Sequence, residues 1–237
     1  MPGSSTPTER RPLDLRGETA NLEPVSQGRF ITFEGGEGGG KSTQLRRLTE
    51  RLSGAGHEVV ATREPGGSPG AEAIRDLLVR GEADRWSAMT ETLLMYAARR
   101  DHVERVISPA LARGAWVLCD RFADSTRAYQ GAAGGTDPAF IAALETHVLG
   151  GVRPDLTLIL DLPPQTGLAR AASRAGAETR FESKGEAFHS RLRQGFLDIA
   201  AAEPERCCVI DATQSLDAVS LSIWLALEER LGGAVRG

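Results

Sequence analysis

Short apolar runs alternate along the chain with longer stretches of helical spacing. Five runs have the length of a strand, at residues 30–34, 57–62, 115–120, 156–161 and 207–211. Between the first two runs, Leu45, Leu48 and Leu52 share one face of a predicted helix, and residues 93–112 predict a longer helix that breaks near Pro109. The fourth run lacks polar alternation, which is typical of strands buried on both faces of a parallel sheet. The pattern therefore predicts a three-layer α/β fold, with a five-stranded parallel sheet covered by helices on both faces.

Residues 1–27 differ from the rest of the chain. They contain prolines and charged residues with little apolar periodicity, and we interpret them as a disordered N-terminal tail. A transit peptide is the alternative interpretation, which the acidic residues of this segment disfavour. Residues 28–237 are expected to form one domain, in keeping with the usual size of domains.

Composition narrows the class of protein. The 237 residues carry a formal net charge of −4, which gives no reason to expect a nucleic-acid partner. No run approaches the ~18 apolar residues of a membrane span, and no early segment resembles a secretion signal. Two of the three cysteines, Cys207 and Cys208, are adjacent, whereas a disulfide framework needs well-spaced pairs. We therefore expect a cytoplasmic protein without a membrane partner.

A glycine-rich loop follows the first predicted strand. It fits the phosphate-binding pattern G-x-x-x-x-G-K-[ST] and consists of Gly35, Gly36, Glu37, Gly38, Gly39, Gly40, Lys41 and Ser42. Its glycines allow consecutive backbone N–H groups to surround phosphate oxygens, and the helix that begins there adds a partial positive charge. Lys41 supplies a full charge, and the Ser42 hydroxyl is a suitable ligand for Mg²⁺. The loop predicts a nucleoside triphosphate site, which many ATPases, GTPases and kinases share.

The end of the third predicted strand helps to separate these classes. It ends in Asp120 and Arg121, where a motor ATPase usually carries an Asp-Glu pair, and the chain has no N/T-K-x-D guanine motif of a GTPase. Asp120 can hold the hydration shell of Mg²⁺, while Arg121 brings a cation to the phosphates. Gln130, a little further on, could form two hydrogen bonds to the edge of a base.

Further arginines lie where phosphoryl transfer would need positive charge. They follow the second strand, lie on the predicted helices, or cluster in a candidate lid at about residues 170–184: Arg63, Arg75, Arg99, Arg170, Arg174 and Arg180. Guanidinium groups bind phosphates with two hydrogen bonds at once. A lid that carries arginines would also exclude water and so prevent hydrolysis of the donor. The distribution favours a kinase that transfers a phosphoryl group from one phosphorylated substrate to another.

Several longer motifs resemble the bacterial thymidylate kinase family, whose members phosphorylate dTMP with ATP. The resemblance covers about residues 29–231, and besides the phosphate loop with Phe33 and Glu34 it rests on Thr62-Arg63-Glu64-Pro65-Gly66-Gly67, Tyr96-Ala97-Ala98-Arg99, Asp120-Arg121-Phe122, Ser125-Thr126-Arg127-Ala128-Tyr129-Gln130-Gly131, Arg153-Pro154-Asp155-Leu156-Thr157-Leu158 and Asp211-Ala212-Thr213. The resemblance implies a P-loop nucleoside monophosphate kinase that makes dTDP for dTTP synthesis. It also implies a homodimer with a helical interface.

The resemblance further implies roles for individual positions. ATP would be bound by Gly35, Gly36, Glu37, Gly38, Gly39, Gly40, Lys41, Ser42 and Thr43, with Mg²⁺ at Ser42 and Asp120. The dTMP site would comprise Arg63, Glu64, Arg75, Met95, Arg99, Arg121, Ser125, Thr126 and Gln130. Catalysis would depend on Lys41, Arg121, Arg174 and Arg180. Because the loop holds Glu37 and no arginine, the lid would supply the catalytic arginines, as in the bacterial group.

The sequence departs from the family at Met95, where members usually carry an aromatic residue that stacks on thymine. A thioether packs on a ring without such stacking. Two alternatives to dTMP phosphorylation therefore stay open. One is a different nucleotide or deoxynucleoside kinase, and the other is a nucleotide-binding regulatory protein without turnover. The segment Ser125–Gln130 favours dTMP over the first, and the complete set of Lys41, Ser42 and Arg121 disfavours the second.

Overall fold

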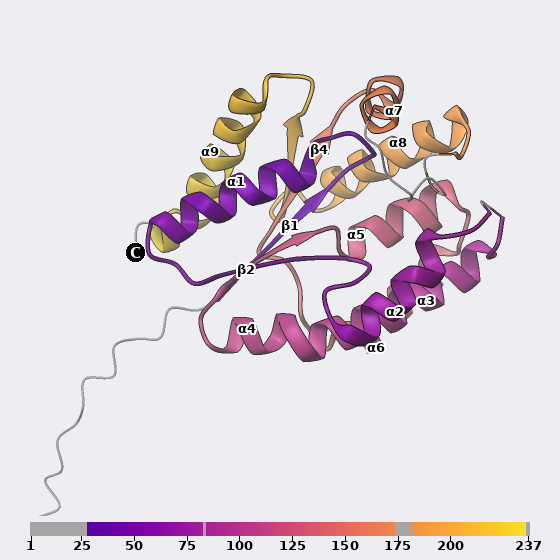
Figure 1. The fold of residues 1–237 in the computed structure, drawn as a ribbon, viewed down its shortest axis with the longest axis horizontal. Helices are drawn as coiled ribbons and strands as arrows, with labels where there is room; N and C mark the ends of the chain where they lie inside the picture. Colours follow the sequence, from indigo (N-terminus) through magenta and orange to yellow (C-terminus); the bar gives the residue numbers. More distant parts are fainter. Residues whose placement is uncertain (1–27, 83, 174–180, 182, 236–237) are drawn as a thin grey trace, which may run out of the picture.

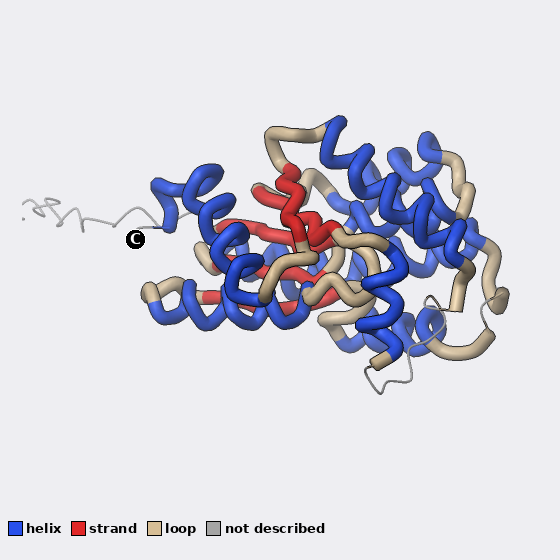
Figure 2. The backbone as a smooth tube through the Cα atoms, turned by 90° about the horizontal axis from the view of Figure 1, so that it is seen from above, coloured by secondary structure: helices blue, strands red, loops and turns tan. Residues whose placement is uncertain are grey.

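Five strands form one parallel sheet in the computed structural model, which describes residues 28–82, 84–173, 181 and 183–235 (Figures 1 and 2). The strands are β1 (Arg29–Glu34), β2 (Val59–Arg63), β3 (Trp116–Asp120), β4 (Leu156–Asp161) and β5 (Cys207–Asp211). Their order across the sheet is β2-β3-β1-β4-β5. The prediction of a five-stranded parallel sheet is confirmed, with the second strand displaced towards Arg63, which is its last residue.

Helices connect and follow the strands. The α-helices are α1 (Lys41–Gly54), α2 (Pro69–Val79), α3 (Ala88–His102), α4 (Ser108–Ala112), α5 (Ala123–Thr126), α6 (Pro138–Leu149), α7 (Pro164–Ala172), α8 (Glu186–Ala202) and α9 (Leu216–Val235). Two π-helical segments are η1 (Val103–Ile107) and η2 (Arg127–Ala133). The predicted break near Pro109 is instead η1, which joins α3 to α4. Pro109 itself lies in the first turn of α4, where a missing N–H costs least.

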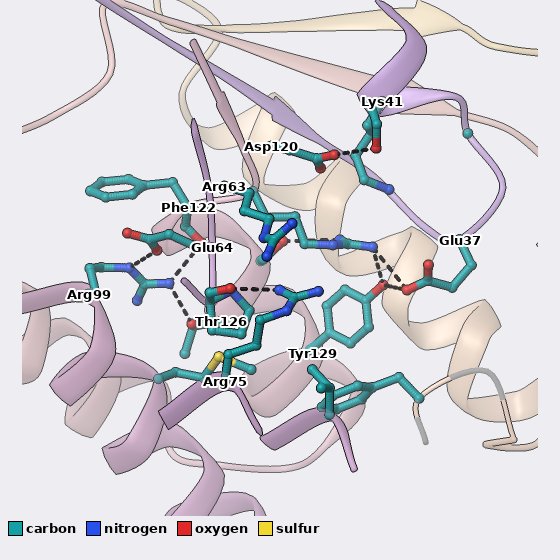
Figure 3. Close-up of a pocket in the computed structure, with 18 of the residues that line it drawn as sticks. Glu37, Lys41, Arg63, Glu64, Arg75, Arg99, Asp120, Phe122, Thr126 and Tyr129 are labelled. Carbon is teal, nitrogen blue, oxygen red and sulfur yellow. Dashed lines mark hydrogen bonds and ion pairs between the residues drawn. The ribbon is translucent and has the colours of Figure 1, made fainter. Parts of the chain in front are cut away.

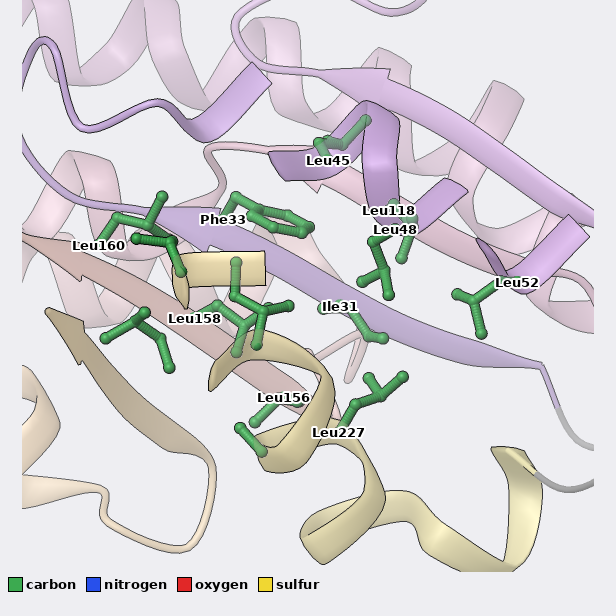
Figure 4. Close-up of a cluster of buried hydrophobic side chains, with 14 of the residues drawn as sticks. Ile31, Phe33, Leu45, Leu48, Leu52, Leu118, Leu156, Leu158, Leu160 and Leu227 are labelled. Atoms are coloured by element: carbon green, nitrogen blue, oxygen red, sulfur yellow. The ribbon is translucent and has the colours of Figure 1, made fainter. Parts of the chain in front are cut away.

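Alternate residues of the central strands feed two separate cores. Ile31 and Phe33 of β1 point to the face covered by α1 and α9, where they pack with Leu45, Leu48 and Leu227 (Figure 4). Phe30 of β1 and Val117 of β3 point to the other face and pack with η1 and α4. A third cluster lies beneath η2 and α8. Both faces of the sheet are thus buried, as the absence of polar alternation predicted.

The phosphate loop and the chain after β3 emerge at the carboxyl ends of adjacent strands. β1 lies between β3 and β4, so the segments after Glu34, Asp120 and Asp161 meet at one edge of the sheet. This is where parallel α/β sheets bind ligands. The predicted tail at 1–27 and the two predicted lid arginines, Arg174 and Arg180, lie outside the described residues. Among the described helices, none is long and apolar enough to cross a membrane.

Candidate functional site

The phosphate loop wraps around the ammonium group of Lys41. Lys41 begins α1, and its Nζ donates to the carbonyl oxygens of Gly35 at 3.2 Å and Gly36 at 2.7 Å. These bonds hold the side chain back across its own loop. The first N–H groups of α1 lack intrahelical partners and face the same region, so the loop combines a fixed cation with a helix N-terminus. The arrangement can bind the phosphates of a nucleotide.

Gly167 of α7, which lies outside the phosphate-loop motif, allows the loop to pack closely against α7. Gly38 has φ = 69°, and a Cβ atom there would lie 2.1 Å from the carbonyl oxygen of Gly167 in α7. A Cβ on Gly167 would in turn lie 2.4 Å from the carbonyl oxygen of Glu37. Backbone therefore packs directly on backbone between α7 and the loop. No pattern in the sequence identified Gly167, because this contact joins segments far apart in the chain.

We expect Gly167→Ala to displace the loop. The added methyl group meets rigid backbone, and overpacking of this kind costs roughly 1–3 kcal/mol of unfolding free energy. The matched control is Gly54→Ala at the end of α1, where a Cβ meets nothing within 4 Å. Urea unfolding and the KM for ATP measure the two effects. Gly167→Ala should lower stability and raise the KM, whereas Gly54→Ala should do neither; an unchanged KM in Gly167→Ala would show that the loop tolerates the displacement.

Three acidic residues at the edge of the sheet have different partners. Ser42 Oγ donates to Asp120 Oδ2 at 2.6 Å. Glu37 accepts from Arg121, and Asp161 accepts two hydrogen bonds from Arg193 on α8, at 2.7 and 2.8 Å. Asp120 and Ser42 therefore form the pair of hard oxygens that suits Mg²⁺, which binds through one or two protein ligands plus phosphates and water. Asp161 instead forms an ion pair with Arg193.

Arg121 is held by both its backbone and its side chain. It has φ = 72°, in the left-handed region that costs an L-residue roughly 1–2 kcal/mol, and its N–H donates to the carbonyl of Phe33. Its guanidinium donates to the Gly35 carbonyl, Ser125 Oγ, Glu37 Oε1 and the Tyr129 hydroxyl, at 2.9 to 3.2 Å. The unusual backbone conformation directs the cation towards the phosphate loop, and four contacts fix it there.

Charges in the loop shift each other's pKa values. Burial by itself raises the pKa of Glu37, but Arg121 and Lys41 outweigh it and lower this pKa to about 2. Burial together with the charge of Arg121 lowers the pKa of Lys41 from 10.5 to about 8, against the opposing effect of Glu37. Glu37 is thus a permanent anion between two cations, whereas Lys41 lacks enough negative charge around it. Bound phosphates would supply that charge.

Glu34, at the end of β1, organises the turn after β3. Its carboxyl group is fully buried and accepts from the N–H groups of Phe122 and Ser125 and from Ser125 Oγ. Burial, reinforced by the charge of Asp124, raises the pKa of Glu34 to about 8. Asp124 in turn accepts from Arg206 at 2.6 Å and 3.1 Å. These contacts fix α5, which carries two of the predicted site residues.

A cavity of about 370 Å³ opens between the phosphate loop and α3 (Figure 3). We call it the α3-side cavity. It brings together residues of the loop, of the segment after β2, of α2 and α3, and of the chain after β3: Glu37, Gly38, Gly39, Gly40, Lys41, Ser42, Arg63, Glu64, Pro65, Arg75, Val79, Met95, Arg99, Asp120, Arg121, Phe122, Ser125, Thr126, Tyr129, Gln130 and Phe181. Every position predicted for the dTMP site lines this cavity.

Arg99 is the most completely buried cation of the cavity wall. Its Nε donates to Glu64 at 2.6 Å, and its Nη2 donates to the Phe122 carbonyl and to Thr126 Oγ1 at 3.0 and 3.1 Å (Figure 3). Its Nη1 is buried and has no hydrogen-bond partner among the described residues. A buried guanidinium nitrogen without a partner is costly, and a ligand that accepted a hydrogen bond from it would remove that cost.

Gln130 is a second buried side chain with one unsatisfied atom. It lies in η2, and its Nε2 donates to Glu91 Oε2 at 3.1 Å. Since a carboxylate only accepts, this contact orients the amide and leaves Oε1 as an acceptor. Oε1 is buried and has no partner in the part of the chain that the structure describes. The sequence predicted two ligand contacts from Gln130, but Glu91 already takes one of them.

The other predicted residues have weaker or different roles in the cavity wall. Arg63 pairs with Glu72 at 3.2 Å and is half exposed, while Arg75 donates to the Pro65 carbonyl at 2.6 Å. Met95 lies on α3, four residues before Arg99, and lines the same cavity. Tyr129, which was not among the predicted binding residues, bridges Glu37 and Arg121 through its hydroxyl.

A second cavity, of about 450 Å³, lies on the opposite side of the loop. We call it the α9-side cavity because Leu216 and Val219 of α9 line it. Arg170 of α7 donates to the Ala212 carbonyl beside it. Gly38, Gly39 and Gly40 line both cavities. The loop therefore forms a wall between two spaces, which suits a nucleotide on either side of the transferred phosphate.

Comparisons with known proteins agree with this geometry. A family model described as thymidylate kinase matches residues 33–223. Thymidylate kinases of Caulobacter vibrioides and Nitrobacter hamburgensis are 69% and 55% identical, over 88% and 90% of this chain and 100% and 94% of their own. The crystal structure of thymidylate kinase from Ehrlichia chaffeensis is 36% identical, with a TM-score of 0.70, and the match covers 84% of this chain and 98% of that one. The chain therefore belongs to the thymidylate kinase family.

Proposed function

We propose that the protein transfers the γ-phosphoryl group of ATP to dTMP, giving ADP and dTDP. The observation that carries the choice of acceptor is a pair of buried atoms without partners among the described residues, on two side chains that line the α3-side cavity. Arg99 Nη1 is a donor and Gln130 Oε1 is an acceptor. Thymine offers the complementary pair, an O4 acceptor beside an N3–H donor. Cytosine carries an amino group and an unprotonated N3 at these positions, so both contacts would become unfavourable.

ATP would bind across the phosphate loop. Its triphosphate would lie on the loop and the N-terminus of α1, with Lys41 at the β- and γ-phosphates and the base in the α9-side cavity. Ser42 and Asp120 would hold Mg²⁺, which neutralises phosphate charge when bound. The dTMP phosphate is a dianion near neutral pH (its second pKa is ~6). It needs no general base, so positioning by Arg121 and exclusion of water by the lid arginines, Arg174 and Arg180, would account for the chemistry of the protein.

The test of this function is ADP release with ATP and Mg²⁺ against a panel of acceptors. We expect dTMP to be preferred over dUMP, dCMP, dGMP, AMP and thymidine. A preference for another monophosphate would retain the phosphate chemistry and reject the assignment of the base pocket. Binding of ATP without turnover of any acceptor would favour the regulatory alternative.

Gln130→Ala should weaken the choice between bases. A buried hydrogen bond of this kind is worth ~1–3 kcal/mol, so kcat/KM for dTMP should fall roughly 5- to 150-fold, and the ratio of dTMP to dCMP activity should fall with it. The KM for ATP should stay near its original value. The matched control is Gln194→Ala, which removes an exposed glutamine from α8. Equal losses for dTMP and ATP would contradict the assigned pocket.

We also expect a cytoplasmic homodimer. Three of the exposed large apolar side chains lie on the neighbouring helices α2 and α3: Leu77, Met89 and Leu93, at 41%, 43% and 48% exposure. Exposed apolar groups on adjacent helices suit a contact between two copies of a chain. Light scattering after size-exclusion chromatography measures the mass in solution, and a value near the 25.3 kDa of one chain would contradict the dimer.

A further inference from the structure

His102 is a fully buried residue that the chemistry above does not use. It is the last residue of α3, one turn beyond Arg99, and its exposed fraction is 0%. Its Nδ1 lies 2.9 Å from Glu64 Oε1, and its Nε2 lies 2.7 Å from Thr62 Oγ1. His102 is not one of the described residues that line the α3-side cavity. Any effect of His102 on the site must therefore pass through another residue.

Glu64 is that residue, because it is shared between His102 and Arg99. Its Oε1 faces His102 and its Oε2 accepts from Arg99 Nε, so both oxygens of one buried carboxylate are used. A carboxylate accepts only, so Nδ1 of His102 carries a proton that it donates to Glu64. The order of contacts is Thr62 to His102 to Glu64 to Arg99. It ends at Arg99, a residue of the cavity wall whose Nη1 has no partner in the described part of the chain.

The surroundings of His102 are shaped for this contact. Thr62 belongs to β2, where it pairs in register with Cys119 of β3, so one end of the chain of contacts is anchored in the sheet. Gly67 leaves room for the ring, because a Cβ there would lie 2.4 Å from His102 Nε2 and 2.5 Å from Thr62 Oγ1. The ring is thus fixed on both sides, and its orientation sets that of Glu64.

We propose that His102 is a positioning residue for the acceptor nucleotide, which holds Glu64 so that Glu64 directs Arg99 Nη1 into the α3-side cavity. The proposal rests on the proposed role of Arg99 in binding dTMP. It predicts an effect on dTMP binding without an equal effect on ATP, because the loop and Lys41 make none of these contacts. A histidine that only fills the core would affect both substrates alike, through stability.

The amide variants His102→Asn and His102→Gln separate these possibilities. Asn carries an N–H close to the place of Nδ1 and can still donate to Glu64, whereas the Gln amide reaches the place of Nε2 and faces Thr62. Each variant loses one hydrogen bond, so their melting temperatures should fall alike. The KM for dTMP should stay within about threefold in His102→Asn and rise at least about tenfold in His102→Gln, with KM for ATP and kcat changed little in both. Equal dTMP values in the two variants would overturn the proposal.

A double-mutant cycle tests whether His102 acts through Glu64. In Glu64→Gln the side chain can no longer accept from His102 and Arg99 together, so the KM for dTMP should rise. If the two residues act in sequence, adding His102→Gln should raise it no further. If the increases in the KM for dTMP from the two substitutions multiply in the double variant, the proposal is overturned. If His102→Gln does not fold, Glu64→Gln must still raise the KM for dTMP while His102→Asn does not.

Arg99→Lys distinguishes failure of this proposal from failure of the proposed function. An unchanged KM for dTMP in Arg99→Lys would reject the role of Arg99, and the argument for His102 would fall with it. A raised KM in Arg99→Lys together with an unchanged one in His102→Gln would reject His102 alone.

Discussion

Lys41→Ala is expected to lower kcat roughly 10²- to 10³-fold, the usual effect of removing one group that stabilises charge in the transition state. Lys41 is the cation that the loop itself encloses, through the carbonyls of Gly35 and Gly36. Adding methylammonium to Lys41→Ala should not restore the full rate, because the free cation is not held in the position that the lysine side chain occupies. Steady-state ADP release at saturating dTMP measures the change.

The fold should survive this substitution. Because burial lowers the pKa of Lys41 from 10.5 to about 8, the folded state disfavours its charged form relative to the unfolded state. Lys41 therefore costs stability below pH 8, and this cost is relieved as the pH rises from about 8 to 10.5. For the same reason, the affinity of the enzyme for ATP should fall above about pH 8.

The control for Lys41→Ala is Arg46→Ala. Arg46 lies on the same helix, is 64% exposed and pairs only with Glu50 among the described residues. It should retain the original rate. A Lys41→Ala variant that is folded and turns over within about threefold of the original rate would contradict the role of Lys41, since the loss of one such group usually costs ~10² or more.

Arg121→Ala is expected to lower kcat/KM for dTMP roughly 10³-fold, the lower end of the effect of an arginine that stabilises phosphoryl transfer. Its guanidinium is fixed by four contacts and lies between the loop and the α3-side cavity. Truncation also leaves the carboxylate of Glu37, with its pKa of about 2, without its main partner. Arg121→Lys should recover little, because an ammonium group cannot reproduce the planar set of donors.

Backbone strain provides the control for Arg121. Because φ is 72° at this position, Arg121→Gly relieves strain that Arg121→Ala retains. If the side chain carries the effect, both variants should be equally slow although Arg121→Gly has the relaxed backbone. Recovery of activity in Arg121→Gly alone would mean that the backbone turn, and not the guanidinium, limits the reaction. Nucleotide binding followed by fluorescence shows whether ATP affinity is retained.

The elements of the fold could be predicted because their signals are local. The run at 156–161 coincides with β4, and the phosphate loop lies between β1 and α1, as its motif requires. The ends of a strand were harder to predict where pairing with another strand decides them. β2 begins at Val59 and not at His57, because Val59 is the residue that pairs with Trp116 of β3. The π-helical segment η1 was not predicted, because no residue type marks a π-helical turn in the way that proline marks the interruption of a helix.

The members of the site were predictable from motifs, but their partners were not. Arg63 and Arg99 carry the same charge, and each belongs to a motif that the family shares, yet Arg63 is half exposed beside Glu72 and Arg99 is buried against Glu64. Asp120 and Asp161 both end buried strands. Only the packing of α8 gives Asp161 an arginine and leaves Asp120 to Ser42.

The sequence by itself determined the α/β class, the phosphate loop and the family, because these depend on periodicity and on residues adjacent in the chain. The tertiary structure decided what each polar group can still offer to a ligand. Gln130 Oε1 has no partner among the described residues because Glu91, 3.1 Å from the amide nitrogen, fixes the orientation of the amide. Gly167 must be a glycine because the loop lies against α7. Contacts between segments 35 or more residues apart, such as Arg99 with Glu64, arise only when the sheet forms. A donor or acceptor that already has a partner in the protein cannot bind the ligand, and no local sequence pattern shows which groups those are.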